Sequence, residues 1–327
     1  MPKTLRIKDL PISPFPGSKR KRFDALAGRK KRDCLIDPFL GGGALALLCD
    51  CPLKIVAEGD PALNLQWQFI LQNRWKEVLQ EMTAWQKKVS YLLSTAGYFA
   101  YCTLTPKKRR KEAVLPGNEL ALVFLEEMDK LWSQLLKSLK SSDDLKQAAA
   151  ALAVRKLSFA SYTREGKDGQ LNIKWTTDKL ASFVNFDGKQ PIIKGEWSLH
   201  KDAFDAISAY MCQPIDNAIA LIDPPYWLPP VDGVRNQLTP SYRGHKPHNP
   251  ETFALGIASL RLLSSLTTVR RIAYCNYYSK PMDAAVRQTA EACSRSVELI
   301  EFGVLDQSHQ GHGLQRANNL DCAWILI

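Results

Sequence analysis

The sequence predicts an α/β protein with a doubly wound sheet, into which a helical segment with a β-hairpin is inserted. Apolar runs typical of buried strands alternate with helical patterns near both ends of the chain. A glycine-rich turn follows the first apolar run and leads into a helix. Over roughly 71–178 this alternation stops, and we interpret that segment as an insertion.

The first predicted strand covers 33–37, and a helix follows the glycine turn from Ala44 to Cys49. A second strand is expected at 53–57, ending near Glu58-Gly59-Asp60, and 62–93 has a strongly helical pattern. The first predicted segment covers residues 1–70, so the helical pattern at 62–93 continues into the insertion.

The predicted insertion is helical from about 118 to 157 and ends in a hairpin. Residues 158–175 alternate polar and apolar around Gly166-Lys167-Asp168-Gly169, which is typical of a β-hairpin. We therefore expect three segments, at 1–70, 71–178 and 179–327.

The last segment returns to alternating elements. A short strand or loop and then a helix are expected at 199–209, followed by a strand at 218–222. After a loop rich in Pro, Gly and His, the remaining elements are two helices and three strands. They are a helix at 251–265, a strand at 270–275, a helix at 281–293 and strands at 296–304 and 320–327.

The composition favours a nucleic-acid partner. The 327 residues carry a formal net charge of +11, which suits a polyanion, although a generic basic surface has the same composition. No apolar segment is long enough to cross a bilayer and no secretory signal is present, so we expect a cytoplasmic protein with no membrane partner. The eight cysteines are expected to be reduced, with Cys49 and Cys51 as two buried thiols, and no metal site is predicted. No feature indicates an obligate protein partner.

The most informative motif is Asp223-Pro224-Pro225-Tyr226. It follows the apolar run 218–222, and two prolines cannot continue a ladder, so the chain leaves the sheet there. Ligands of open α/β sheets bind at this edge. A carboxylate beside a backbone carbonyl suits an exocyclic amine, and the Tyr226 ring suits stacking on a base. The alternative is a strand-ending turn with a surface tyrosine.

Two further motifs suit a nucleotide-like ligand. The turn Asp37-Pro38-Phe39-Leu40-Gly41-Gly42-Gly43 lets backbone approach a ligand closely, although it lacks the spacing of a dinucleotide or phosphate loop. Asp60 follows the second strand, where an acid accepts hydrogen bonds from ribose hydroxyls. A packing turn, helix capping by Asp60, and Glu58 as the ribose acid remain alternatives.

These motifs, in this order, resemble the Dam-type DNA adenine-N6 methyltransferases, which use S-adenosylmethionine. The resemblance implies a Rossmann-like methyltransferase sheet and a target-recognition domain between its two halves. Asp223, Pro224, Pro225 and Tyr226 match the family's catalytic DPPY. The implied cofactor residues are Phe15, Pro16 and Lys19 in the N-terminal motif, Asp37, Pro38, Phe39, Leu40, Gly41 and Gly43 in the "PFxGxG" loop, the ribose acid Asp60, the "GDF"-like Asp202, Ala203 and Phe204, and Asp223.

The same resemblance implies double-stranded DNA as the partner. The segment 155–175 is similar to the family's recognition hairpin, and the basic run at 107–111 lies within the insertion. The loop 239–245 is interpreted either as closing over the target base or as an ordinary surface loop. The expected DNA-binding residues are Lys107, Lys108, Arg109, Arg110, Ser161, Thr163, Arg164, Asn172 and Tyr242.

The expected chemistry is methyl transfer to a flipped-out adenine. Asp223 and the Pro224 carbonyl would accept the two N6 hydrogens, and Tyr226 would stack on the extruded base. Two alternatives stay open. One is transfer to another amine, either of RNA adenine or at cytosine N4. The other is a DNA-binding module with a vestigial cofactor site.

Overall fold

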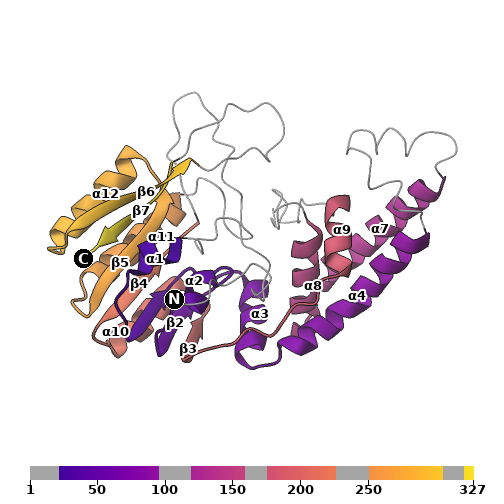
Figure 1. Cartoon of the computed structure of the whole chain (residues 1–327), viewed down its shortest axis with the longest axis horizontal. Helices are drawn as coiled ribbons and strands as arrows, with labels where there is room; N and C mark the ends of the chain where they lie inside the picture. Colours follow the sequence, from indigo (N-terminus) through magenta and orange to yellow (C-terminus); the bar gives the residue numbers. More distant parts are fainter. Residues whose placement is uncertain (1–21, 96–118, 159–174, 226–249, 305–319) are drawn as a thin grey trace. The chain divides into compact units, whose positions relative to one another are not determined.

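The computed structural model describes residues 22–95, 119–158, 175–225, 250–304 and 320–327 (Figure 1). The chain divides into two compact units. One unit comprises Gly17–Pro61 and Ile192–Ile327 and contains the sheet. The other comprises Met1–Pro16 and Ala62–Pro191, and its described part is helical.

The sheet has seven strands in the order β3-β2-β1-β4-β5-β7-β6. The first five strands of that order are parallel, whereas β7 is antiparallel to both β5 and β6. The strands are β1 (Cys34–Asp37), β2 (Leu53–Ala57), β3 (Glu196–His200), β4 (Ala218–Ile222), β5 (Val269–Tyr277), β6 (Val297–Val304) and β7 (Leu320–Leu326).

The strand order reverses at β1. From β1 the chain adds β2 and β3 on one side, and it later adds β4 and β5 on the other. This mixed, mostly parallel sheet is compatible with a Rossmann-like fold, as the alternating pattern predicts. The antiparallel insertion of β7 between β5 and β6 is a feature that the sequence pattern does not reveal.

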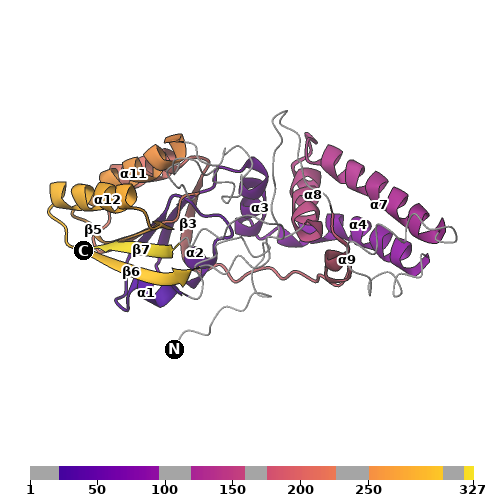
Figure 2. The ribbon, with the colours of Figure 1, turned by 90° about the horizontal axis from the view of Figure 1, so that it is seen from above.

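Helices cover both faces of the sheet. The core on one face combines the sheet with α10 (Ala203–Cys212), α11 (Pro250–Ser264) and α12 (Lys280–Ala292). Neighbouring strand residues point to opposite faces, and Ile272 of β5 belongs to this core. Arg271 therefore faces the other side, where it donates to the carbonyls of Leu26 and Ala25 in α1 (Phe23–Ala27). Figure 2 shows α1 on the other side of the sheet from α11 and α12.

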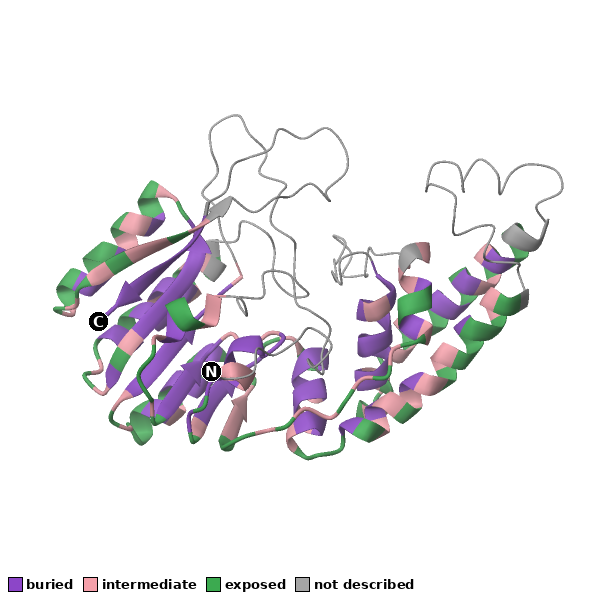
Figure 3. Cartoon of the chain, viewed as in Figure 1, coloured by how far each residue is buried: buried purple, intermediate pink, exposed green. Residues whose placement is uncertain are grey.

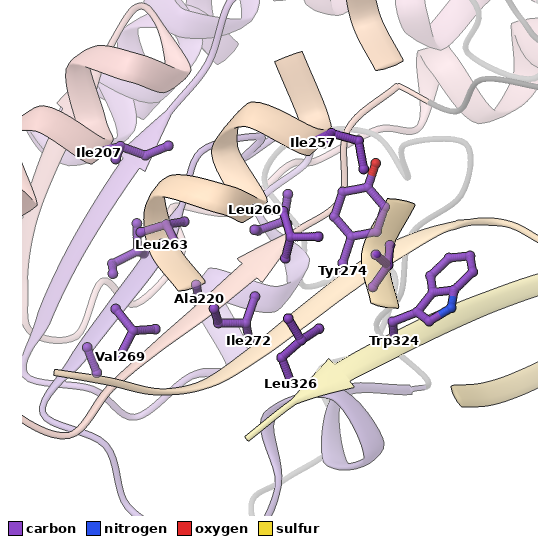
Figure 4. Close-up of a cluster of buried hydrophobic side chains, with 14 of the residues drawn as sticks. Ile207, Ala220, Ile257, Leu260, Leu263, Val269, Ile272, Tyr274, Trp324 and Leu326 are labelled. Atoms are coloured by element: carbon purple, nitrogen blue, oxygen red, sulfur yellow. The ribbon is translucent and has the colours of Figure 1, made fainter. Parts of the chain in front are cut away.

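The strands are buried because helices lie on both faces. All residues of β1 and β4 are buried (Figure 3). Figure 4 shows aliphatic side chains of α11 facing those of β5 and β7, with Tyr274 and Trp324 at one end of the cluster. A short helix, α2 (Ala44–Leu48), joins the glycine turn to the segment before β2.

The helical unit is built around α8, which packs against α4, α7 and α9. Most of α8 is buried, and its alanines allow close helix packing. Its helices are α3 (Pro61–Leu71), α4 (Trp75–Thr95), α7 (Glu119–Ser138), α8 (Asp144–Leu157) and α9 (Thr177–Val184).

Two segments that the sequence pattern presents as continuous helices are each broken in two. The 62–93 pattern is interrupted at Asn73, whose φ of 58° lies in the left-handed region. The 118–157 pattern is interrupted before α8, where the Asp143 side chain accepts hydrogen bonds from the amides of Leu145 and Lys146.

The predicted hairpin at 158–175 is described only at its ends. Ser158 and Trp175 form an isolated antiparallel bridge, which brings the two ends of this segment together. Residues 159–174 lie outside the described part of the chain, so the hairpin and the recognition role of the insertion remain predictions. Among the described helices, none is long and apolar enough to cross a membrane.

Candidate active site

The candidate site lies at the carboxyl edge of the sheet, where the strand order reverses. Asp37 ends β1, and Asp223 directly follows the neighbouring parallel strand β4. Ile36 of β1 pairs with Ala220 of β4, so the two strands end at nearly the same level of the sheet. This reversal point is where open α/β sheets bind ligands.

The turn after β1 is held by backbone hydrogen bonds. Phe39 donates to the Asp37 carboxylate at 3.2 Å, and Leu40 donates to the carbonyl of Ala57 in β2 at 2.8 Å. Gly41 and Gly43 have φ of 51° and 65°, a region that side chains rarely adopt. The turn is therefore fixed to β2, and its shape requires these two glycines.

Three acids gather at this edge. Asp37 and Glu58 are buried, and Asp223 is half-buried. Burial is the main cause that raises the pKa of Asp37 to about 8. The amide of Phe39 opposes this rise, while the negative charges of Asp223 and Glu58 add to it. The edge is therefore locally acidic in a chain whose net charge is +11.

Asp60 and Glu58 have different environments. The Glu58 carboxylate accepts a hydrogen bond from the Asp60 amide at 2.7 Å, and the Glu58 amide donates to the carbonyl of His200 in β3. Glu58 is thus part of the framework that joins β2 to β3. Asp60 is half-exposed, and a Cβ added at Gly59 would meet only the Lys201 carbonyl, at 3.9 Å. Asp60 is the more accessible acid for a ligand.

Asp202 begins α10 after β3. Its carboxylate accepts a hydrogen bond from the Phe204 amide at 2.7 Å, so Asp202 is the N-cap of this helix. Ala203 is buried, whereas Phe204 is 38% exposed. The aromatic ring is therefore accessible beside the end of β3.

Pro224 packs closely against α11. A Cβ added at Gly256 would lie 3.2 Å from Cγ of Pro224 and 2.8 Å from the Tyr274 hydroxyl oxygen. Tyr274 is fully buried in β5, and burial raises the pKa of its phenol. Gly256 and Tyr274 are not among the residues that the sequence motifs predict for the site. A glycine inside a helical pattern is the signal that indicates such a close approach.

The structure places the described motifs at the ends of four adjacent strands. The glycine turn follows β1, Asp60 follows β2, Asp202 follows β3 and Asp223 follows β4. The remaining predicted residues lie outside the described part of the chain. They are Phe15, Pro16, Lys19 and Tyr226, and the DNA-binding set of Lys107, Lys108, Arg109, Arg110, Ser161, Thr163, Arg164, Asn172 and Tyr242.

The described residues contain no group of three or more His, Cys, Asp or Glu side chains that could hold a metal ion. No family model matches the chain, and a search of curated proteins found no match. The site is therefore interpreted from its own residues and geometry.

Proposed function

We propose that this protein is an S-adenosylmethionine-dependent DNA adenine-N6 methyltransferase. The observation that carries the proposal is the position of Asp223-Pro224-Pro225. This segment follows β4 immediately beside the glycine turn of β1, at the point where the strand order reverses. A motif suited to an amine and a turn suited to a nucleotide-like ligand are thus neighbours at one edge.

The residues at this edge fit the chemical groups of the cofactor. Asp60 is accessible at the end of β2, where it would accept hydrogen bonds from the ribose hydroxyls. The negative charges of Glu58 and Asp223 at this edge favour a positively charged sulfonium. When bound, S-adenosylmethionine supplies an electrophilic methyl group.

Asp223 and Pro224 would act on the target base. Asp223 would accept one N6 hydrogen, and the Pro224 carbonyl would accept the other, which returns electron density to the nitrogen. Each proline fixes its own φ, and Pro225 also restricts the backbone of Pro224, so the Pro224 carbonyl is held in a defined orientation before the base arrives. The buried contact of Pro224 with α11 adds to this rigidity. The positive net charge of the chain supports DNA as the partner.

The test combines donor binding with product analysis. The full chain is incubated with methyl-labelled S-adenosylmethionine and duplex DNA, and the nucleosides are separated after digestion. We expect label in N6-methyladenine. Label in N4-methylcytosine, or label only when RNA replaces DNA, would identify a different amine. A chain that binds DNA but shows no calorimetric signal with the donor would be a binding module.

Two variants assign the roles within the site. Asp223→Ala should abolish transfer and leave donor affinity nearly unchanged, because Asp223 is assigned to the base amine. Asp60→Ala should weaken donor binding by about 1.5–3 kcal/mol, since a charged acceptor is removed. Near-normal turnover in Asp223→Ala would contradict the catalytic assignment. Unchanged donor affinity in Asp60→Ala would contradict the ribose assignment.

A further inference from the structure

Cys49 and Cys51 form a close pair of thiols before β2. Their sulfur atoms are 2.9 Å apart, and both side chains are buried. Cys49 follows α2 in an extended conformation, with φ of −72° and ψ of 126°. The side chain of the intervening Asp50 is 82% exposed, so the buried pair flanks an exposed residue.

A buried ammonium lies beside this pair. Lys54 is 1% exposed, and its Nζ donates to the carbonyls of Cys51 at 2.9 Å and Lys194 at 2.8 Å. Its positive charge favours the thiolate forms of Cys49 and Cys51, whereas the carboxylate of Asp50 opposes ionisation of Cys49.

The two thiols are not equivalent. The hydrogen bond with Cys51 is the main cause that lowers the pKa of Cys49, and the charge of Lys54 acts in the same direction. The same hydrogen bond, followed by burial, raises the pKa of Cys51. The two sulfurs share one hydrogen bond in which either atom could be the donor, and the nearby charge of Lys54 favours a thiolate at Cys49.

We propose that Cys49 and Cys51 are a dithiol that hydroperoxides oxidise to an intramolecular disulfide, with Cys49 as the attacking sulfur. In nearly extended backbone, residues i and i+2 project to the same side, which brings the two sulfurs together. The pair precedes β2, at the opposite end of this strand from Glu58. The pair therefore lies at the other end of β2 from Glu58, although the charge of Cys49 adds to the raised pKa of Asp37, and the inference does not depend on the proposed function.

The reaction has two steps. The Cys49 thiolate attacks one oxygen of hydrogen peroxide, the O–O bond breaks, and the leaving hydroxide takes a proton to form water. This step oxidises Cys49 to a sulfenic acid. The Cys51 sulfur then loses its proton and attacks the Cys49 sulfur, the S–O bond breaks, and a second water leaves. Overall, two thiols and one peroxide give one disulfide and two waters.

The chain supplies an internal control in Cys34. This residue has no exposed surface, and burial is the main cause that raises its pKa to about 12. We expect Cys34 to remain a thiol under conditions that oxidise the pair. Trypsin cleavage after Arg32 and Lys54 leaves all three cysteines in the peptide 33–54, so a single peptide reports on the whole group.

The experiment treats the folded full chain with hydrogen peroxide, alkylates free thiols after denaturation, and analyses this peptide by mass spectrometry. We expect a product that is lighter by two hydrogen atoms before alkylation, carries one alkyl group on Cys34, and shows no fragmentation between positions 49 and 51. Dithiothreitol should restore three alkylated thiols. A bridge that involves Cys34, or three free thiols after treatment, would overturn the proposal.

Single variants test the order of attack. In Cys51→Ser, Cys49 should accumulate as a sulfenic acid that dimedone traps. In Cys49→Ser, Cys51 should stay unmodified, and Cys34→Ser should form the disulfide as the wild type does. Lys54→Met should slow the oxidation. If circular dichroism shows that Lys54→Met is misfolded, Cys49→Ser and Cys51→Ser still decide which sulfur attacks first. Trapping on Cys51 instead of Cys49 would overturn the assignment of the nucleophile.

Discussion

Asp37 and Asp223 leave two adjacent parallel strands at the same edge of the sheet, and the charge of Asp223 contributes to the raised pKa of Asp37. Burial is the larger cause, and together these effects place the pKa of Asp37 at about 8. Asp37 is therefore mainly protonated at neutral pH. The neutral Asp37 carboxyl supports the glycine turn by accepting the Phe39 amide. Its neighbour Asp223 is the acid that we propose contacts the target adenine.

The raised pKa of Asp37 predicts a specific dependence of stability on pH. In the unfolded chain an aspartate titrates near about 3.9. Between that pH and about 8, the folded state holds a proton that the unfolded state has released. The free energy of unfolding should thus fall as the pH rises through this range, by up to about 1.4 kcal/mol per pH unit from this group. Below this range the contribution is constant.

Asp37→Asn should remove this dependence because the amide does not titrate. Its carbonyl oxygen still accepts the Phe39 amide, so the turn is preserved. We expect urea unfolding to give a higher free energy of unfolding for the variant than for wild type at pH 8. At pH 4 the two proteins should differ little. Asp50→Asn is the matched control, since the Asp50 side chain is 82% exposed. Equal pH profiles for wild type and Asp37→Asn would show that Asp37 is ionised in the folded state.

The close packing at Gly256 predicts a localised defect. In Gly256→Ala the new methyl group would meet the Tyr274 hydroxyl at 2.8 Å and Pro224 at 3.2 Å. Overpacking of this kind costs about 1–3 kcal/mol. Thermal unfolding should therefore show a lower Tm. The same change at Gly59 is the control, because its nearest neighbour would be 3.9 Å away and we expect an effect below about 0.5 kcal/mol. Equal Tm values for the two variants would contradict the tight contact.

The sequence pattern predicts strands well because apolar runs reflect burial. The predicted strands 33–37, 53–57 and 218–222 correspond to β1, β2 and β4. Helix ends inside long periodic patterns were missed, since the break at Asn73 depends on one left-handed residue within an otherwise continuous apolar stripe. The position of β7 between β5 and β6 was also missed, because strand order depends on contacts between distant segments.

The positions of the candidate residues could be predicted where a motif occupies consecutive residues. Asp37, Asp60, Asp202 and Asp223 all lie at strand ends, as the motif order predicts. Tyr274 and Gly256 were not predicted, because their part in the site comes from packing against Pro224 across the fold. The roles of these residues in binding and catalysis remain predictions, which the variants described above would test.

Asp202 has a capping role that is separable from its predicted contact with the cofactor. Asp202→Ala removes the acceptor of the Phe204 amide, so α10 should become less stable by about 1 kcal/mol. Asp202→Asn keeps the cap, since asparagine is an equally good N-cap residue. If Asp202 also accepts a hydrogen bond from the donor's adenine, both variants should bind S-adenosylmethionine more weakly, and only Asp202→Ala should be less stable. Calorimetry and thermal unfolding measure the two effects. Unchanged donor affinity in Asp202→Asn would limit the residue to capping.

The last prediction uses two basic runs at different places in the chain. The run at 107–111 lies in the predicted recognition segment, outside the described residues. The exposed residues Arg29, Lys30 and Lys31 precede β1 and thus lie at the amino edge of the sheet, away from the candidate site. Replacing Lys107, Lys108 and Arg109 by glutamine should reduce the slope of log affinity against log salt on duplex DNA. The expected reduction is about 0.9 for each phosphate that these side chains neutralise in the wild type.

The matched control replaces Arg29, Lys30 and Lys31 by glutamine, which removes the same charge. We expect its salt slope to equal that of wild type, because long-range attraction is screened and direct phosphate contacts set the slope. Neither variant should change the preferred DNA sequence, since phosphate contacts position the protein and do not specify bases. Equal reductions in both variants would show that total charge governs binding. A reduction only in the control would place DNA at the amino edge of the sheet, and the candidate site would then have to act on another substrate.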